Sequence, residues 1–165
     1  MNKLEDTLNT NQFIRRANLY VSVNGQVGVE IQQKSPVARV QTHESFYVDE
    51  EGKYMPVSSN FSVRVPLVTG EVNKNDMSDL FKVVTALRND SFFKKQVEGI
   101  EVKKDKYHFL MREFDFVVDV GTSENVKLKL NNFKAFYQKA LKDKTLNNYS
   151  KVNLQIASQV VCTKK

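Results

Sequence analysis

The first third of the chain carries a β-hairpin pattern behind a short helical segment. Leu4 and Leu8 lie one helical turn apart, which predicts a helix over residues 4–14. Apolar positions then alternate with other residues over 19–31, on both sides of Asn24-Gly25. Because Asn-Gly tolerates positive φ at both centres of a type I′ turn, we predict a β-hairpin here.

The middle of the chain predicts extended segments followed by helices. Residues 37–40 can form a strand after a proline, and a second hairpin is expected over 46–57, where alternating apolar residues flank a polar turn. Apolar residues recur at helical spacing from an acidic start, which predicts a helix over about 76–88. A second helical turn is expected around 92–97.

From residue 100 onward the apolar period changes to two. Alternation over 107–112, 114–120 and 126–130 predicts three short strands, each with one polar face. A helix over about 133–142, capped by Asn131 or Asn132, would then cover the sheet. These patterns predict an α+β fold with an antiparallel β-meander covered by two helices.

The last segment predicts one long terminal strand with a candidate partner-binding edge. Its residues are Val152, Asn153, Leu154, Gln155, Ile156, Ala157, Ser158, Gln159, Val160 and Val161. A strand with only one neighbour offers unpaired N–H and C=O groups to another chain. Two alternatives stay open: the strand lies inside the sheet, or Lys151, Lys164 and Lys165 protect its edge.

Composition and charge change this picture only in part. The chain has 165 residues, 41% of them hydrophobic and 27% charged, which suits one globular domain with a core. The formal charge of +6 arises entirely in residues 71–165, where 18 basic residues face 12 acidic ones. The densest basic cluster, Lys103, Lys104 and Lys106, is short and favours a solvated loop over a nucleic-acid arm. No membrane span or signal peptide is expected, so we interpret the chain as soluble as given.

Candidate chemistry is sparse. His43 and His108 lie in different predicted regions, and the single Cys162 cannot form an internal disulfide or a multi-thiolate metal site. Nucleophile, phosphate-loop and metalloprotease motifs are missing from the sequence, and the aromatic residues follow the apolar faces. We therefore expect no enzyme activity, no cofactor and no metal.

Several stretches in a fixed order resemble the extracytoplasmic part of the FtsQ/DivIB family of bacterial cell-division proteins. The resemblance rests on five segments: 9–21 (NTNQFIRRANLYV), 33–40 (QKSPVARV), 46–56 (FYVDEEGKYMP), 65–70 (VPLVTG) and 149–165, which ends QVVCTKK as in Bacteroidetes members. It implies that residues 1–41 are the C-terminal part of a POTRA module. Residues 42–165 would then be an FtsQ-type β domain.

The resemblance also implies a function without catalysis. It points to a divisome scaffold of the inner membrane, with this region in the periplasm and a single membrane helix upstream. In such proteins the last strand, here 152–161, receives a strand of FtsB from the FtsB/FtsL pair, and Lys104 and Lys106 lie near a basic contact. Two alternatives are a POTRA module of a protein translocation or outer-membrane assembly system, and a basic nucleic-acid-binding domain.

Overall fold

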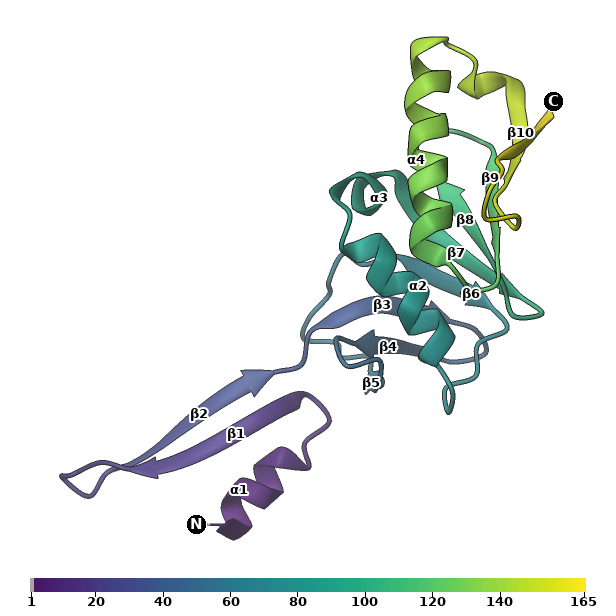
Figure 1. Cartoon of the computed structure of the whole chain (residues 1–165). Coiled ribbons are helices and arrows are strands. Elements are labelled where there is room, and N and C mark those ends of the chain that lie inside the picture. The colour runs from purple at the N-terminus through teal and green to yellow at the C-terminus, as the bar shows by residue number, and fades with distance from the viewer. Residues whose placement is uncertain (1) are drawn as a thin grey trace.

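A computed structural model describes residues 2–165 and divides them between a slender arm and a larger body (Figure 1). The arm contains α1 (Asn2–Asn9) and an antiparallel pair, β1 (Ile14–Val21) and β2 (Val27–Gln33). The body contains a nine-stranded sheet and the other helices. Within the described residues, no helix combines the length and apolar character needed to cross a membrane.

The first predicted hairpin is confirmed, but its turn is not type I′. Ser22 N–H donates to Gln26 O, and Gly25 N–H donates to Ser22 O, each over 2.9 Å. Gly25 has a φ of +80°, whereas Asn24 is outside the positive-φ region. The loop is therefore a type I turn closed by a left-handed glycine, which is the favoured geometry for a three-residue hairpin loop.

The first helix is shorter than predicted because side chains capture the backbone after Asn9. The Asn9 side chain accepts a hydrogen bond from Ala17 N at 2.7 Å and donates to Ala17 O at 3.3 Å. Asn11 Oδ1 accepts a further bond from Phe13 N at 2.9 Å. These bonds compete with helical ones and turn the chain into β1.

The body confirms the α+β class and the second hairpin, β4–β5. Its strand order is β11-β10-β9-β8-β7-β6-β3-β4-β5. The strands are β3 (Pro36–Gln41), β4 (Ser45–Asp49), β5 (Tyr54–Pro56), β6 (Leu67–Gly70), β7 (Val97–Lys103), β8 (Lys106–Met111), β9 (Val117–Gly121), β10 (Tyr149–Asn153) and β11 (Val161–Lys164). The meander β7–β8–β9 is antiparallel, but β3–β6, β6–β7 and β9–β10 are parallel, so the sheet is mixed.

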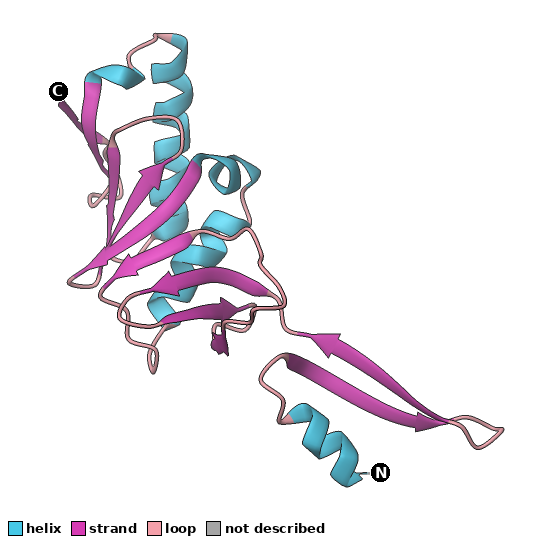
Figure 2. Ribbon diagram, turned by 180° about the vertical axis from the view of Figure 1, so that it is seen from behind, coloured by secondary structure: helices cyan, strands magenta, loops and turns pink. Residues whose placement is uncertain are grey.

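The helices of the body lie on one face of this sheet, and the view from behind shows the other face without helices (Figure 2). They are α2 (Ser78–Arg88), α3 (Ser91–Gln96) and α4 (Val126–Lys142), with a 3-10 helix η1 (Leu146–Asn148). α2 and α3 connect β6 to β7, and α4 connects β9 to β10. Helical crossovers of this kind join parallel strands, which explains two of the three parallel pairs.

The strand predicted over 126–130 is wrong, because these residues form the first turns of α4. Val126 and Leu130 lie four residues apart, so they fit a helical period as well as an alternating one. Phe133 and Tyr137 extend the same buried stripe along the helix. The helix begins after Asn125 rather than at Asn131 or Asn132.

The strand β3 connects the arm to the body. Although it lies within residues 1–41, it pairs with β4 and β6 inside the nine-stranded sheet. The arm therefore ends structurally at residues 34–35, immediately before β3.

Candidate partner-binding edge

The nine-stranded sheet has two free edges, and they differ in how they are protected. β5 has three residues and ends in Pro56, whose nitrogen cannot donate a hydrogen bond. β11 has four residues, Val161–Lys164, and contains no proline. Its one strand neighbour in the sheet is β10. The flank of β11 that faces away from β10 is therefore the less protected edge.

The single long strand predicted over Val152–Val161 is wrong, because the chain reverses within it. Val152 and Asn153 belong to β10, which lies between β9 and β11. Residues 154–160 form a turn, in which Leu154 is buried, Ala157 and Val160 are half-buried, and Gln155, Ile156, Ser158 and Gln159 are exposed. Of the predicted residues, Val161 alone lies on the free edge, and the rest of the edge, Cys162–Lys164, was not predicted.

Asp119 on β9 holds this reversal in place. Leu154 N–H donates to the Asp119 carbonyl at 2.7 Å, and Gln155 Nε2 donates to Asp119 Oδ2 at 2.8 Å. Lys151 Nζ lies 3.1 Å from the same carboxylate. Burial opposes the charge, but hydrogen bonds from Gln155 and Lys151 outweigh it and lower the pKa of Asp119. An ionised carboxylate therefore fixes the path of the chain into β11.

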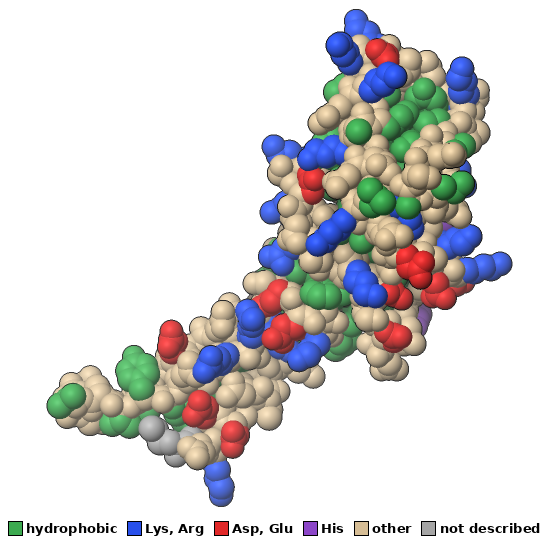
Figure 3. Space-filling model, in the orientation of Figure 1, with side chains coloured by type: hydrophobic (Ala, Val, Ile, Leu, Met, Phe, Trp, Pro, Cys, Tyr) green, Lys and Arg blue, Asp and Glu red, His purple; other side chains and the backbone are tan. Residues whose placement is uncertain are grey.

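Apolar side chains border the free edge on the helix side of the sheet. Phe136 of α4 and Tyr149 of β10 lie with ring centroids 5.7 Å apart, and both are half-buried. Val160 and Cys162 are also half-buried against the core, and burial raises the pKa of the Cys162 thiol. We call these four residues the apolar shelf. Figure 3 shows hydrophobic side chains at the surface between α4 and the C-terminal strands.

Lys104 and Lys106 lie in and after the turn between β7 and β8, and both are exposed. This turn is at the end of the sheet where β10 ends and β11 begins. β8 and β11 are three strand spacings apart, roughly 14 Å. The two lysines thus share an end of the sheet with the reversal, but they do not adjoin β11.

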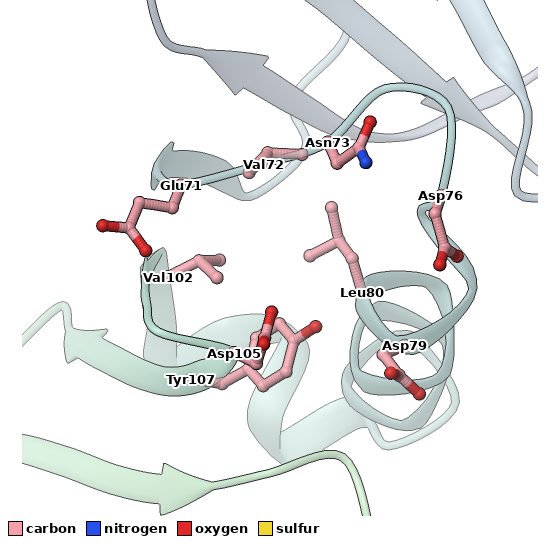
Figure 4. A pocket seen from close by; sticks show the side chains of 9 residues that line it. All are labelled: Glu71, Val72, Asn73, Asp76, Asp79, Leu80, Val102, Asp105 and Tyr107. Carbon is pink, nitrogen blue, oxygen red and sulfur yellow. The ribbon is translucent and has the colours of Figure 1, made fainter.

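An acidic pocket of about 410 Å³ lies at the same end (Figure 4). Glu71, Asp76, Asp79 and Asp105 line it together with Tyr107. Burial, followed by the nearby Asp79 and Asp105 charges, raises the pKa of Tyr107 to about 12. Among the described residues, no group of three or more His, Cys, Asp or Glu side chains is arranged to hold a metal ion.

Neither histidine is among the residues that line this pocket. His43 is exposed in the turn between β3 and β4. His108 of β8 places Nε2 3.6 Å from Asp119 Oδ1, and its buried Nδ1 has no hydrogen-bond partner among the described residues. Each histidine is thus separate from the acidic pocket, and His108 forms part of the polar network around Asp119.

Comparisons with known proteins identify the family. The family model described as FtsQ/DivIB, C-terminal related, matches residues 35–163, which include the body from β3 into β11. A comparison with curated proteins finds no match. Because the family model covers more than half of the sequence, the chain belongs to the FtsQ/DivIB C-terminal related family and is a region of a cell-division protein of that family.

Proposed function

We propose that this chain is a non-enzymatic divisome scaffold that binds a strand of an FtsB/FtsL-type partner along the free flank of β11. The observation that carries the proposal is an edge strand without proline, beside the apolar shelf, whose outer flank has no strand neighbour among the described residues. Membership of a cell-division family supports a division protein as the partner. The proposed binding residues are therefore Val161–Lys164. They share only Val161 with the segment 152–161 that the sequence predicted.

Strand addition takes its affinity and its specificity from different parts of the edge. Every second N–H and C=O of β11 points away from β10, since β10–β11 is an antiparallel pair. These groups supply main-chain hydrogen bonds to a strand of any sequence. The apolar shelf then favours a partner strand with apolar side chains on the helix side, because burying Phe136, Tyr149 and Val160 further is favourable.

The same family supports a cellular setting for this scaffold. We propose that residues 1–41 correspond to part of a POTRA module and residues 42–165 to the β domain, with β3 as the strand through which the first part joins the sheet of the second. The protein would lie in the periplasm and be held at the inner membrane by a helix upstream of this sequence. The translocation and nucleic-acid alternatives have no comparable support, since the family match is to division proteins.

Proline substitutions in β11 test the proposal. N–H groups of adjacent residues in a strand point to opposite sides. Of the two variants Cys162→Pro and Thr163→Pro, one therefore removes a donor that faces β10, and the other removes a donor that faces solvent. We expect the substitution on the solvent side to abolish capture of a co-expressed FtsB-like coiled-coil protein while the circular dichroism spectrum stays unchanged. Hydrogen exchange of residues 161–164 should slow when the partner binds.

Ile156→Pro is the matched control, because Ile156 is 56% exposed in the turn before β11. Capture should survive this substitution. Full capture by folded forms of both β11 variants would overturn the proposal. Loss of capture in Ile156→Pro alone would place the contact on the turn instead.

A further inference from the structure

A second surface of the body, independent of the β11 edge, has the features of a peptide-binding groove. It has a volume of about 760 Å³. It is lined by the start of β3, the segment before β6, the end of α2, α3, the start of β7 and the residue after β8. This volume is within the usual range for ligand sites, about 300–1,000 Å³. Six separate parts of the chain thus form one concavity on the helix side of the sheet.

The floor of the groove is aliphatic and aromatic. Its most buried members are Val37, Val84, Leu87, Phe93 and Val97, each less than 5% exposed. Val63 and Val65 form one wall in the irregular segment before β6. The apolar surface that stays open to a partner is mainly that of this wall, where Val63 is 37% exposed and Val65 is half-buried. Side chains from outside could bury this surface without first displacing the core.

The rim of the groove is strongly basic. Its exposed cations are Arg64, Arg88, Lys94, Lys95 and Arg112, and Glu98 is the one carboxylate that lines the groove. Five cations and one carboxylate give this surface +4 of the formal +6 of the chain. Figure 3 shows Lys and Arg side chains along the flank over α3.

Among the residues that the structure describes, none forms an ion pair with these rim cations. No ion pair within residues 2–165 includes any of the five, although ten other Lys, Arg or His side chains form such pairs. Arg112 Nε donates to the Lys95 carbonyl at 3.1 Å, which keeps that guanidinium at the rim. Unpaired charges of one sign around an apolar floor favour a partner with apolar residues flanked by carboxylates.

We propose that this groove docks a segment of a partner protein in which Asp and Glu flank a short run of apolar side chains. A nucleic acid fits less well, because the aromatic ring of the floor, Phe93, is 1% exposed and cannot stack on a base. The exposed apolar wall at Val63 and Val65 receives the hydrophobic side chains, and the basic rim steers and orients the carboxylates.

A display library of random peptides about 12 residues long, selected on the full chain, tests the proposal. Binders should be enriched in apolar and acidic residues. Their affinity should fall roughly tenfold for the double variant Arg64→Glu/Lys94→Glu, because two attractive rim charges become repulsive. The matched control is Lys139→Glu/Lys142→Glu, which makes the same charge change on the exposed face of α4 and should leave affinity unchanged.

The following outcomes would overturn the proposal. Binders without an acidic excess, equal losses in the two double variants, or no enriched binder at all would each count against a peptide groove. Displacement of the peptides by a single-stranded oligonucleotide of similar length, with loss in both double variants, would show general anion binding. The β11 proline variants should bind the selected peptides normally, so failure here is distinguishable from failure of the edge proposal.

Discussion

The arm and the body carry the same kind of apolar alternation, but the body alone buries it. In β1 and β2, Val21, Val27, Val29 and Ile31 are between 44% and 60% exposed. In the body, strand residues such as Val68 are fully buried. Ala17 is the one buried residue among the described residues of the arm. Alternation therefore specifies a strand and its apolar face, whereas burial depends on a covering layer.

The difference shows where each region obtains its stability. Isolated two-stranded hairpins are marginal in water, and α1 covers the arm only in part. The arm is held at its base by Arg15, which lies 3.6 Å from Glu50, and by Lys34, which lies 3.7 Å from Asp49. Glu50 N–H also donates to Ser35 O at 2.9 Å. The body instead relies on α2, α3 and α4 packed on its sheet.

The largest effect should come from opening the core of the body. Phe133 of α4 is fully buried, and its ring packs near those of Phe93, Phe116 and Tyr137. Phe133→Ala should lower the free energy of unfolding by about 3–5 kcal/mol, because a large cavity remains. Val29→Ala in the arm should cost less than about 1 kcal/mol. Urea unfolding checks both, and similar losses would remove the contrast between the regions.

Glycine substitutions sharpen the comparison at the level of the backbone. Gly70 of the body has a φ of +96°, and a Cβ there would lie 2.1 Å from Val102 O. Gly70→Ala should therefore cost about 2–3 kcal/mol, from positive φ and overpacking together. Gly25 in the arm has a φ of +80° with nothing near a Cβ, so Gly25→Ala should cost about 1 kcal/mol. Thermal unfolding of the two variants checks the order, and equal shifts in Tm would contradict it.

The predictions from sequence succeeded where one period was unambiguous. The hairpins, α2 and the strands β8 and β9 follow from alternation or helical spacing over enough residues, whereas β7 was not among the predicted strands. The strand predicted over 126–130 was wrong because five residues fit an alternating period and a helical period equally well. Phe133 and Tyr137 continue the helical period, so the longer segment identifies a helix. At the C-terminus, alternation continues through a turn that a side chain creates, since Asn153 Oδ1 accepts from Gln155 N at 2.9 Å.

The candidate sites were harder to predict than the elements. The sequence placed the candidate partner edge at Val152–Val161, whereas the free edge strand of the sheet is Val161–Lys164. The groove has no local signal, because its walls and rim come from segments that range from Pro36 to Arg112. Only the tertiary arrangement brings Arg64 and Lys94 to the same surface.

The base of the arm offers a smaller test. Asp49 is fully buried, and its Oδ1 accepts from Glu51 N and Lys53 N, each at 2.9 Å, in addition to the ion pair with Lys34. Asp49→Ala should cost about 1–2 kcal/mol, because two part-buried backbone N–H groups lose their acceptor. Hydrogen exchange should then speed up at the arm more than in the body. The matched control Glu51→Ala, at an exposed position of the same turn, should cost less than about 0.5 kcal/mol.

The smallest expected effect is a dependence of stability on pH. Asp119 of the body is buried, whereas the carboxylates of the arm are all at least partly exposed. Burial opposes the charge of Asp119, yet the Gln155 and Lys151 contacts lower its pKa below the ordinary 3.8. A lowered folded-state pKa adds stability above pH 3.8, which is lost as the pH falls through the lowered value.

Asp119→Asn should therefore be less stable than the wild type at pH 7. The deficit should stay below about 1 kcal/mol, because Lys151 is partly exposed and its ion pair is screened by solvent. The deficit should shrink as the pH falls from 3.8 through the lowered folded-state pKa, because over this range the wild type loses the stability that its charge adds. Urea titrations of both proteins at pH 7 and pH 3 measure it. A deficit that is equal at the two pH values would show that Asp119 acts through hydrogen bonds that an amide can replace only in part, and that its charge does not stabilise the reversal before β11.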